Sequence, residues 1–215
     1  MSVFYGPKFP SDGLVFYVDA GNTRSYPGSG NRWYDLGGTG HYMDLGSSVS
    51  YQSATGGVLR FAEDANGYAR ISDTYVNLST SNNTVITWSR KLSNGNDGRV
   101  VTAYQNNWLL GHHDSTYGDY YAQGWIEGGV ATSDTIWRQY TGNGNISTDV
   151  WELWINDTLR ISNSGGDQGP RGFNVNNQYS QYSSAEVAMI AAWNRVLSGD
   201  EIKLVYELYR GSFGV

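Results

Sequence analysis

The sequence predicts an all-β sandwich of two antiparallel sheets with one short C-terminal helix. Three observations support this prediction. The 215 residues include 28 Gly and only 4 Pro, and 14% of them are aromatic, which is typical of a turn-rich β domain. Short segments that are apolar, or alternate apolar and polar residues, recur between turn residues. One capped helix pattern follows the last apolar segment.

About a dozen short strands are expected, and strands at such close spacing favour a sandwich or a barrel. Residues 151–155 and 158–161 predict a tight hairpin, because Asn156 and Asp157 between them tolerate positive φ. The expected strands are 14–20, 58–61, 68–71, 84–90, 99–104, 108–110, 120–126, 135–140, 151–155, 158–162 and 186–193.

Three stretches are predicted to be loops: residues 21–50, 93–98 and 163–184. The first is dense in Gly and Ser, and the third is polar and rich in Asn, Gln and Tyr. A loop as long as 163–184 in a compact domain usually carries function or is covered by a partner. We therefore expect this loop, rather than any strand, to form an interface.

The chain ends with a buried strand that leads into a helix. Residues 185–193 are apolar and partly β-branched, as in a buried strand. Ser198 and Glu201 form a capping-box pattern, and acidic residues suit the positive end of a helix dipole. Gly211 is expected to end the helix in the left-handed conformation, which gives about three turns over residues 199–210. Its apolar stripe is Ile202, Val205, Tyr206 and Tyr209.

Composition excludes several classes of protein. The formal charge of −6 offers no basic surface for a polyphosphate backbone, so nucleic acid is not an expected partner. The first ten residues lack the features of a signal peptide, and no apolar run approaches the length of a membrane span. We expect neither export by that route nor membrane embedding. The absence of Cys leaves the redox compartment open.

Candidate metal ligands are few, and we expect neither a metal site nor a cofactor. Asp19 and Asp35 are expected to cap turns. Asp64 and Asn66 place oxygens near another turn, which makes calcium the one cation to consider, but calcium requires six to eight oxygens. In the motif at residues 112–114, two His precede an Asp; neighbouring strand residues face opposite sides, so a polar turn is expected.

The sequence also predicts that the protein is not an enzyme. Sandwich glycoside hydrolases use two carboxylates held a set distance apart. Here Glu127, Glu152 and Glu186 are isolated from other acidic residues, and the strand-borne pattern of alternating Glu, Asp and Glu is absent. Neither a Ser nucleophile elbow nor a phosphate-binding Gly loop is present. No catalytic residue is therefore assigned.

Segments near both ends of the chain carry a family pattern. The opening comprises residues 13–22, 25–30 and 33–36, and the closing segment is 192–202. They resemble the concanavalin A-like jelly roll in its laminin-G-like form, and more narrowly the version found in structural proteins of tailed bacteriophages, including cyanophages. The resemblance implies two sheets packed face to face, with the first and last strands paired and a short helix at one edge. By itself it implies no activity.

The resemblance implies a virion structural protein, either a capsid decoration or cement protein or a head- or tail-associated one. Such a protein is made in the host cytoplasm and lies on the virion surface, with the major capsid protein or further copies of the chain as partners. We divide the chain into an N-terminal arm, 1–12, and one domain, 13–215. The alternative for the arm is packing across the open edge of the sandwich. Expected partner contacts are Phe4, Tyr5, Pro7, Phe9 and Pro10 of the arm, with Tyr179 and Tyr182 of the long loop.

The alternative function is a carbohydrate-binding module that recognises host-surface glycans. The chain has 8 Trp and 17 Tyr, and exposed aromatic rings can stack on sugars. Tyr117, Tyr120 and Tyr121 lie near polar residues and are the candidate glycan contacts. The sequence does not distinguish capsid from tail, and it leaves the oligomeric state and the partner surface open.

Overall fold

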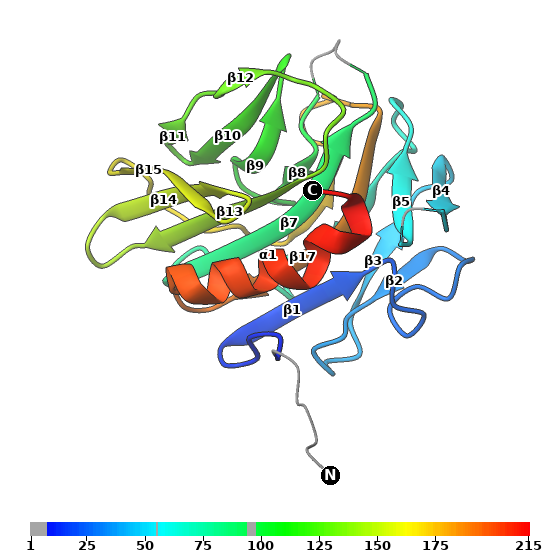
Figure 1. The fold of residues 1–215 in the computed structure, drawn as a ribbon, viewed down its shortest axis with the longest axis horizontal. Coiled ribbons are helices and arrows are strands. Elements are labelled where there is room, and N and C mark those ends of the chain that lie inside the picture. The colour runs from blue at the N-terminus through cyan, green and yellow to red at the C-terminus, as the bar shows by residue number, and fades with distance from the viewer. Residues whose placement is uncertain (1–7, 55, 94–97) are drawn as a thin grey trace.

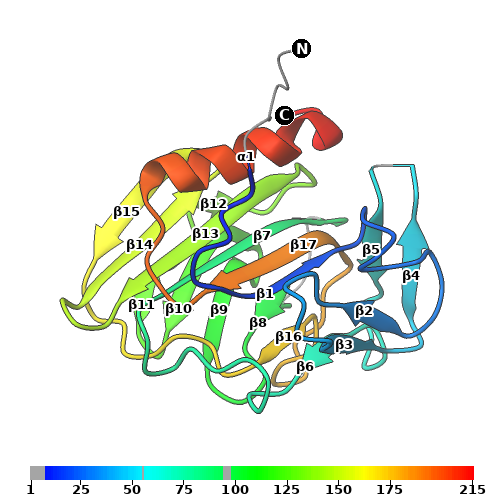
Figure 2. The same cartoon turned by 90° about the horizontal axis from the view of Figure 1, so that it is seen from below.

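The structure is a computed structural model that describes residues 8–54, 56–93 and 98–215. In this part of the chain, 17 strands form two antiparallel sheets stacked face to face, and one helix lies on the outer side of one sheet (Figures 1 and 2). The predicted fold class, a jelly-roll sandwich of two antiparallel sheets with one C-terminal helix, is confirmed. The helix is too short and too polar to cross a membrane, and no other helix occurs in the described ranges.

Sheet A lies directly beneath the helix (Figure 2). Its central strand, β17, is buried along its whole length and pairs with β7 on one edge and with β1 and β5 on the other. The predicted pairing of the first and last strands is therefore confirmed. In sheet order the strands are β15 (Thr158–Asn163), β14 (Val150–Ile155), β13 (Arg138–Asn145), β7 (Asn83–Lys91), β17 (Ala185–Trp193), β5 (Val58–Phe61) and β4 (Val49–Gln52), with β1 (Leu14–Asp19) beside β17.

Sheet B forms the opposite layer and has an outer face that no helix of the described chain covers (Figure 2). In sheet order its strands are β11 (Trp125–Glu127), β10 (Thr116–Ala122), β9 (Trp108–His113), β8 (Val101–Thr102), β16 (Phe173–Val175), β6 (Ala69–Ile71), β3 (Tyr42–Leu45) and β2 (Arg32–Tyr34), and β12 (Ala131–Thr132) pairs with β10.

The main core fills the space between the sheets. Period-two alternation sends every second side chain of a strand inward, and large aromatic residues occupy many of these positions. Trp108 contacts Tyr120 and Phe173 edge to face, with ring centroids 6.0 and 6.3 Å apart. All three are fully buried, and burial of each such side chain contributes about 1.5–3 kcal/mol.

The helix α1 (Gly199–Phe213) packs on the outer face of sheet A. Ser198 accepts a hydrogen bond from the amide of Glu201, and the Glu201 carboxylate accepts one from the Ser198 amide, which confirms the predicted capping box. The predicted end at Gly211 is wrong. The helix continues to Phe213, whose ring lies 4.5 Å from that of Trp137, and Gly214 is the left-handed cap at φ 70°.

The described end of the N-terminal arm packs onto the domain. The ring of Phe9 stacks on Tyr17 at 4.4 Å and on Trp193 at 5.6 Å. The Trp193 indole N–H donates to the carbonyl of Pro10 at 2.9 Å, and the Pro10 side chain is buried. These contacts leave Pro10 little surface for a partner. The other expected arm contacts, Phe4, Tyr5 and Pro7, lie outside the described residues.

Two of the predicted loops contain strands. The stretch 21–50 includes β2, β3 and the start of β4, because Trp33, Met43 and Leu45 point into the core at alternating positions. The stretch 163–184 includes the buried strand β16. The hairpin of β14 and β15 is confirmed, with Asn156 at φ 57°. The expected strand 120–126 is instead two paired strands, because the chain turns at Gln123, where φ is 61°.

Candidate functional site

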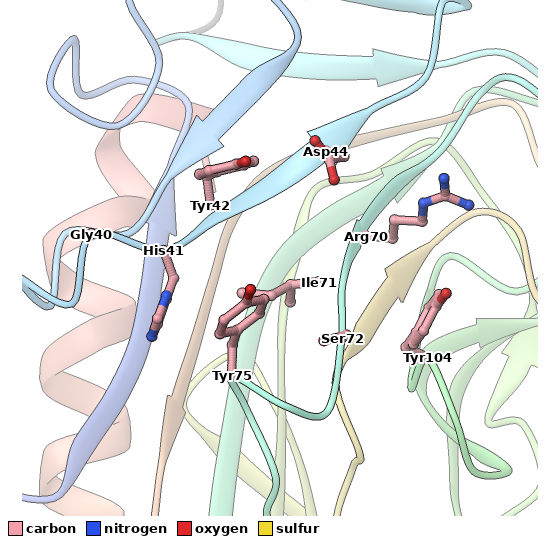
Figure 3. Close-up of a pocket in the computed structure, with 9 residues that line it drawn as sticks. All are labelled: Gly40, His41, Tyr42, Asp44, Arg70, Ile71, Ser72, Tyr75 and Tyr104. Carbon is pink, nitrogen blue, oxygen red and sulfur yellow. The ribbon is translucent and has the colours of Figure 1, made fainter.

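A cavity of about 550 Å³ opens between β3 and β6 and is here called the sheet B groove (Figure 3). Alternation along the two strands creates it. Met43 and Leu45 point into the core, which directs Tyr42 and Asp44 outward, and Arg70 points outward from β6 in the same way. The lining residues are Gly40, His41, Tyr42, Asp44, Arg70, Ile71, Ser72, Tyr75 and Tyr104.

Aromatic rings form much of the wall of the groove. His41 and Tyr75 lie side by side, with ring centroids 4.5 Å apart (Figure 3). Tyr75 is 56% exposed, so its ring is open to solvent at the groove. Tyr42 contacts Tyr34 at 5.8 Å, and Tyr104 lies at the other side of the groove. The groove therefore offers several ring surfaces to solvent.

Two short loops beyond the strands hold Tyr75 and Tyr104 in place. The turn after β6 is closed by the Tyr75 amide, which donates to the carbonyl of Ser72 at 3.2 Å. The amide of Tyr104 donates to the carbonyl of Arg171 at 3.2 Å. The Arg171 guanidinium pairs with Asp73 at 2.6 Å, so one residue fixes both loops. This connection makes the groove a preformed feature rather than a gap between free loops.

The charged groups of the groove lie on neighbouring strands. Asp44 and Arg70 are directly opposite in the register of β3 and β6, and Arg32 is opposite Asp44 on the other side. The Arg70 guanidinium lies 4.6 Å from the centroid of the Tyr68 ring. Within residues 8–54, 56–93 and 98–215 it forms no salt bridge. Both donors and acceptors are thus available along one wall.

Sequence reasoning named none of the groove residues as a site. Residues 40–44 fell in the predicted loop 21–50, whereas Arg70, Ile71 and Tyr104 fell in the expected strands 68–71 and 99–104. The signal was present in residues 42–45, where Tyr, Met, Asp and Leu alternate between exposed and buried positions. The Gly residues on both sides of this segment hid it, because Gly at positions 38, 40 and 46 is typical of loops.

The three predicted glycan contacts lie on β10 and have different environments. Tyr120 is fully buried between Trp108 and Trp151, which corrects the prediction for this residue because no glycan can reach it. Tyr117 is half-buried beneath the Arg138 guanidinium, 3.9 Å from its ring centroid. Tyr121 is half-buried as well and contacts the exposed ring of Trp125.

The two predicted partner contacts of the long loop lie away from the sheet B groove. Tyr179 is 61% exposed, and the Arg99 guanidinium lies 5.1 Å from its ring centroid. Tyr182 is half-buried. Neither residue lines the groove.

The calcium candidate Asp64 accepts a hydrogen bond from the amide of Asn66 at 2.7 Å within its own turn. Asp19 and Asp35, which were expected to cap turns, do so. Asp35 accepts hydrogen bonds from the amides of Tyr17 and Thr39, and Asp19 accepts one from the amide of Gly21. In the described ranges no cluster of three His, Cys, Asp or Glu side chains could hold a metal ion. His112 is fully buried and its neighbour His113 is partly exposed, so the two imidazoles face opposite sides. The expected polar turn is wrong for both His residues, because β9 extends to His113 and the turn begins at Asp114.

No protein-family model matches the sequence, and no curated protein matches it significantly. Solved structures do match the fold. The binding domain of Paraclostridial Mosquitocidal Protein 1 aligns with a TM-score of 0.66 and 17% identity over 93% of this chain and 53% of that one. Botulinum neurotoxin binding domains also align. That of serotype D, in complex with N-acetylneuraminic acid, gives 0.65 and 13% over 92% and 51%.

A third similar structure is the binding domain of botulinum neurotoxin DC in complex with rat synaptotagmin II, with a TM-score of 0.69 and 10% identity over 93% of this chain and 52% of that one. The chain spans about half the length of these toxin domains. Identities this low show the fold alone. They support the jelly-roll sandwich but not the expected link to phage structural proteins.

Proposed function

We propose that the protein is a non-catalytic carbohydrate-binding domain that holds a saccharide in the sheet B groove. The observation that carries this proposal is the combination of exposed rings with polar side chains in one preformed cavity. A pyranose has apolar C–H faces that pack on aromatic rings and hydroxyl edges that need hydrogen bonds. Tyr75 and His41 supply the rings, and Asp44, Arg70 and Ser72 supply the polar groups. The volume of about 550 Å³ suits a small ligand.

The similar structures support binding rather than catalysis. They include toxin binding domains, one of them in complex with N-acetylneuraminic acid. Another comes from botulinum neurotoxin type C, whose cell entry depends on interaction with two ganglioside molecules. Since this chain covers only about half of those domains, the likeness supports the class of ligand and not its position. Arg70, which has no carboxylate partner in the described chain, could pair with the carboxylate of an acidic sugar.

The lining of the groove argues against glycoside hydrolysis at this position. Hydrolysis of that kind uses two carboxyl groups on either side of the scissile bond. Asp44 is the one carboxylate among the lining residues of the described groove. A bound saccharide would therefore be held without being cleaved.

Virion assembly is a second candidate function, and it continues to rest on the sequence resemblance. The structural feature that favours a protein partner is Tyr179, whose ring is 61% exposed on a loop and is held beside Arg99. Exposed Tyr and Arg side chains are common at protein interfaces. Electron microscopy of purified particles tests this function. Regular copies of the protein on the capsid or tail would support it, and absence of the protein from particles would contradict it.

A glycan array tests the carbohydrate proposal. We expect the full chain to bind a subset of glycans, and Tyr75→Ala to weaken that binding about tenfold or more. Tyr179→Ala is the matched control, because it removes an equally exposed Tyr outside the groove. Arg70→Ala should weaken the binding of acidic glycans more than the binding of neutral ones. Absence of binding to any glycan, or equal loss in Tyr75→Ala and Tyr179→Ala, would contradict the proposal.

A further inference from the structure

A second cavity, of about 450 Å³, lies near the other end of sheet B and is here called the Trp125 pocket. It shares no residue with the sheet B groove, and strands β8 and β16 separate β9 from β6 in the sheet. Tyr120 points into the core, so the neighbouring Tyr121 and its partner Trp125 face outward. The lining residues are His113, Asp114, Ser115, Thr116, Asp119, Trp125 and Gly128.

Trp125 is the clearest sign of a ligand in this pocket. It is 48% exposed, whereas the other Trp side chains of the described chain are buried or partly buried. Trp is strongly buried on average, and an exposed indole that lines a cavity together with polar side chains is the arrangement expected of a ligand site. The ring is held from two sides, by Tyr121 at 5.1 Å and by His113 at 5.7 Å.

The backbone directs Trp125 into this position. The chain reverses at Gln123, which has a positive φ of 61°, and the pairing of β10 with β11 shifts register between Tyr120 and Tyr121. Irregularities of this kind re-aim side chains and are frequent beside functional sites. The exposed indole is thus a built feature of the hairpin.

Fixed hydrogen-bond acceptors lie beside the indole. Asp119 is only 2% exposed, and its carboxylate accepts from the His113 amide at 3.2 Å and from the Thr116 hydroxyl at 3.0 Å. A carboxylate has about four lone-pair sites, and Asp119, unlike Tyr120, lines the cavity, so capacity for a ligand remains there. The neighbouring turn is also held, because the ammonium of the buried Lys91 donates to the carbonyl of Asp114 at 2.6 Å.

The charges around the pocket indicate the class of ligand. Asp114 and Asp119 are carboxylates in the lining, and no Lys or Arg among the described residues lines the cavity, which disfavours an acidic sugar. A cationic ligand is disfavoured as well, because the Lys91 ammonium already lies 2.6 Å from the Asp114 carbonyl beside the pocket. A neutral sugar fits both conditions: its C–H face can pack on the indole and its hydroxyls can donate to the carboxylates.

We propose that Trp125 and Asp119 form a second saccharide site, specific for a neutral pyranose, on the same outer face of sheet B as the groove. The class of ligand rests on the proposed function, but the residues and the chemistry are independent of the groove. Two sites on one face would let a single chain hold two sugars of one glycan surface, and linked sites raise the overall affinity.

Titration followed by nuclear magnetic resonance tests this proposal. The full-length, ¹⁵N-labelled protein is titrated to millimolar concentrations with lactose, cellobiose and maltose, and separately with sialyllactose and with choline. The indole N–H resonance of Trp125 is identified by its loss in Trp125→Phe, and the other indole resonances report that each variant is folded. We expect at least one neutral disaccharide to shift the Trp125 resonance with a saturable curve.

We also expect Trp125→Ala to weaken this binding about tenfold or more, while Tyr75→Ala leaves it unchanged. The proposal is overturned if none of the three neutral disaccharides shifts the Trp125 resonance, if Trp125→Ala binds them as the wild type does, or if only sialyllactose or choline binds there. Binding at the sheet B groove is measured separately, by the loss of array binding in Tyr75→Ala. Failure of one proposed site is therefore distinguishable from failure of the other.

Discussion

Replacing Glu201 by Gln should reveal how much the start of α1 stabilises the domain. The Glu201 carboxylate accepts hydrogen bonds from the Arg195 guanidinium at 2.5 and 2.9 Å and caps the helix through the Ser198 amide. Arg195 is the main reason that the pKa of Glu201 falls from its usual 4.5 to about 2. Gln can still complete the capping box, so this variant removes the charge and one of the two hydrogen bonds from Arg195.

The magnitude follows from the pKa. A fall from 4.5 to about 2 corresponds to about 3 kcal/mol, at ~1.4 kcal/mol per pKa unit. The two side chains are 28% and 30% exposed, so solvent screening reduces the effect, and we expect Glu201→Gln to lower the free energy of unfolding by about 1–2 kcal/mol at neutral pH. Because the pKa is depressed in the folded state, this stabilisation is present above 4.5 and is lost as the pH falls towards 2.

Urea unfolding followed by Trp fluorescence measures this difference at about pH 7 and at about pH 3. The matched control is Glu207→Gln, which removes the charge from an exposed ion pair with Arg210 in the same helix and should change stability little. The reasoning would be refuted if Glu201→Gln were as stable as the wild type at neutral pH, or if it lost the same free energy of unfolding at both pH values.

Three further variants have defined outcomes. Asp119→Asn should be more stable than the wild type above about pH 6, by about 1–3 kcal/mol. Burial raises the pKa of Asp119 from 3.8 to about 6, so ionisation of the folded protein costs stability as the pH rises through that range. Thermal unfolding at a series of pH values measures the difference. Tyr120→Ala should cost about 3–5 kcal/mol in urea unfolding, because the ring is fully buried, whereas Tyr121→Ala should cost clearly less. Phe213→Ala should destabilise the domain by about 1–3 kcal/mol, because it removes the ring that stacks on Trp88 at 5.0 Å and contacts Trp137. If a chain truncated after Arg210 had the stability of the wild type, this prediction would be refuted.

Features set by local chemistry could be predicted from the sequence. The capping box at Ser198 and Glu201 and the hairpin around Asn156 depend on residues close in the chain, and both are confirmed. The end of the helix could not be predicted in the same way. Gly211 has the residue type of a helix stop, but contacts of Phe213 with Trp88 and Trp137, far away in the sequence, extend the helix past it.

The candidate sites depend on which strands pair and on which face of the sheet each side chain lies. Tyr120 and Tyr121 are neighbours, yet one lies in the core and the other faces outward, because successive side chains of a strand point to opposite faces of the sheet. The sheet B groove needs β3 and β6 to pair so that Asp44 meets Arg70. That pairing joins segments separated by a long stretch of chain, and no local pattern indicates it.

A crystal structure with the glycan that binds most strongly on the array tests the central claim most directly. We expect the saccharide to lie in the sheet B groove, with a sugar ring against Tyr75 and polar contacts to Asp44 or Arg70. A saccharide bound elsewhere on the protein, with the groove empty, would contradict the assignment of this groove as the principal binding site.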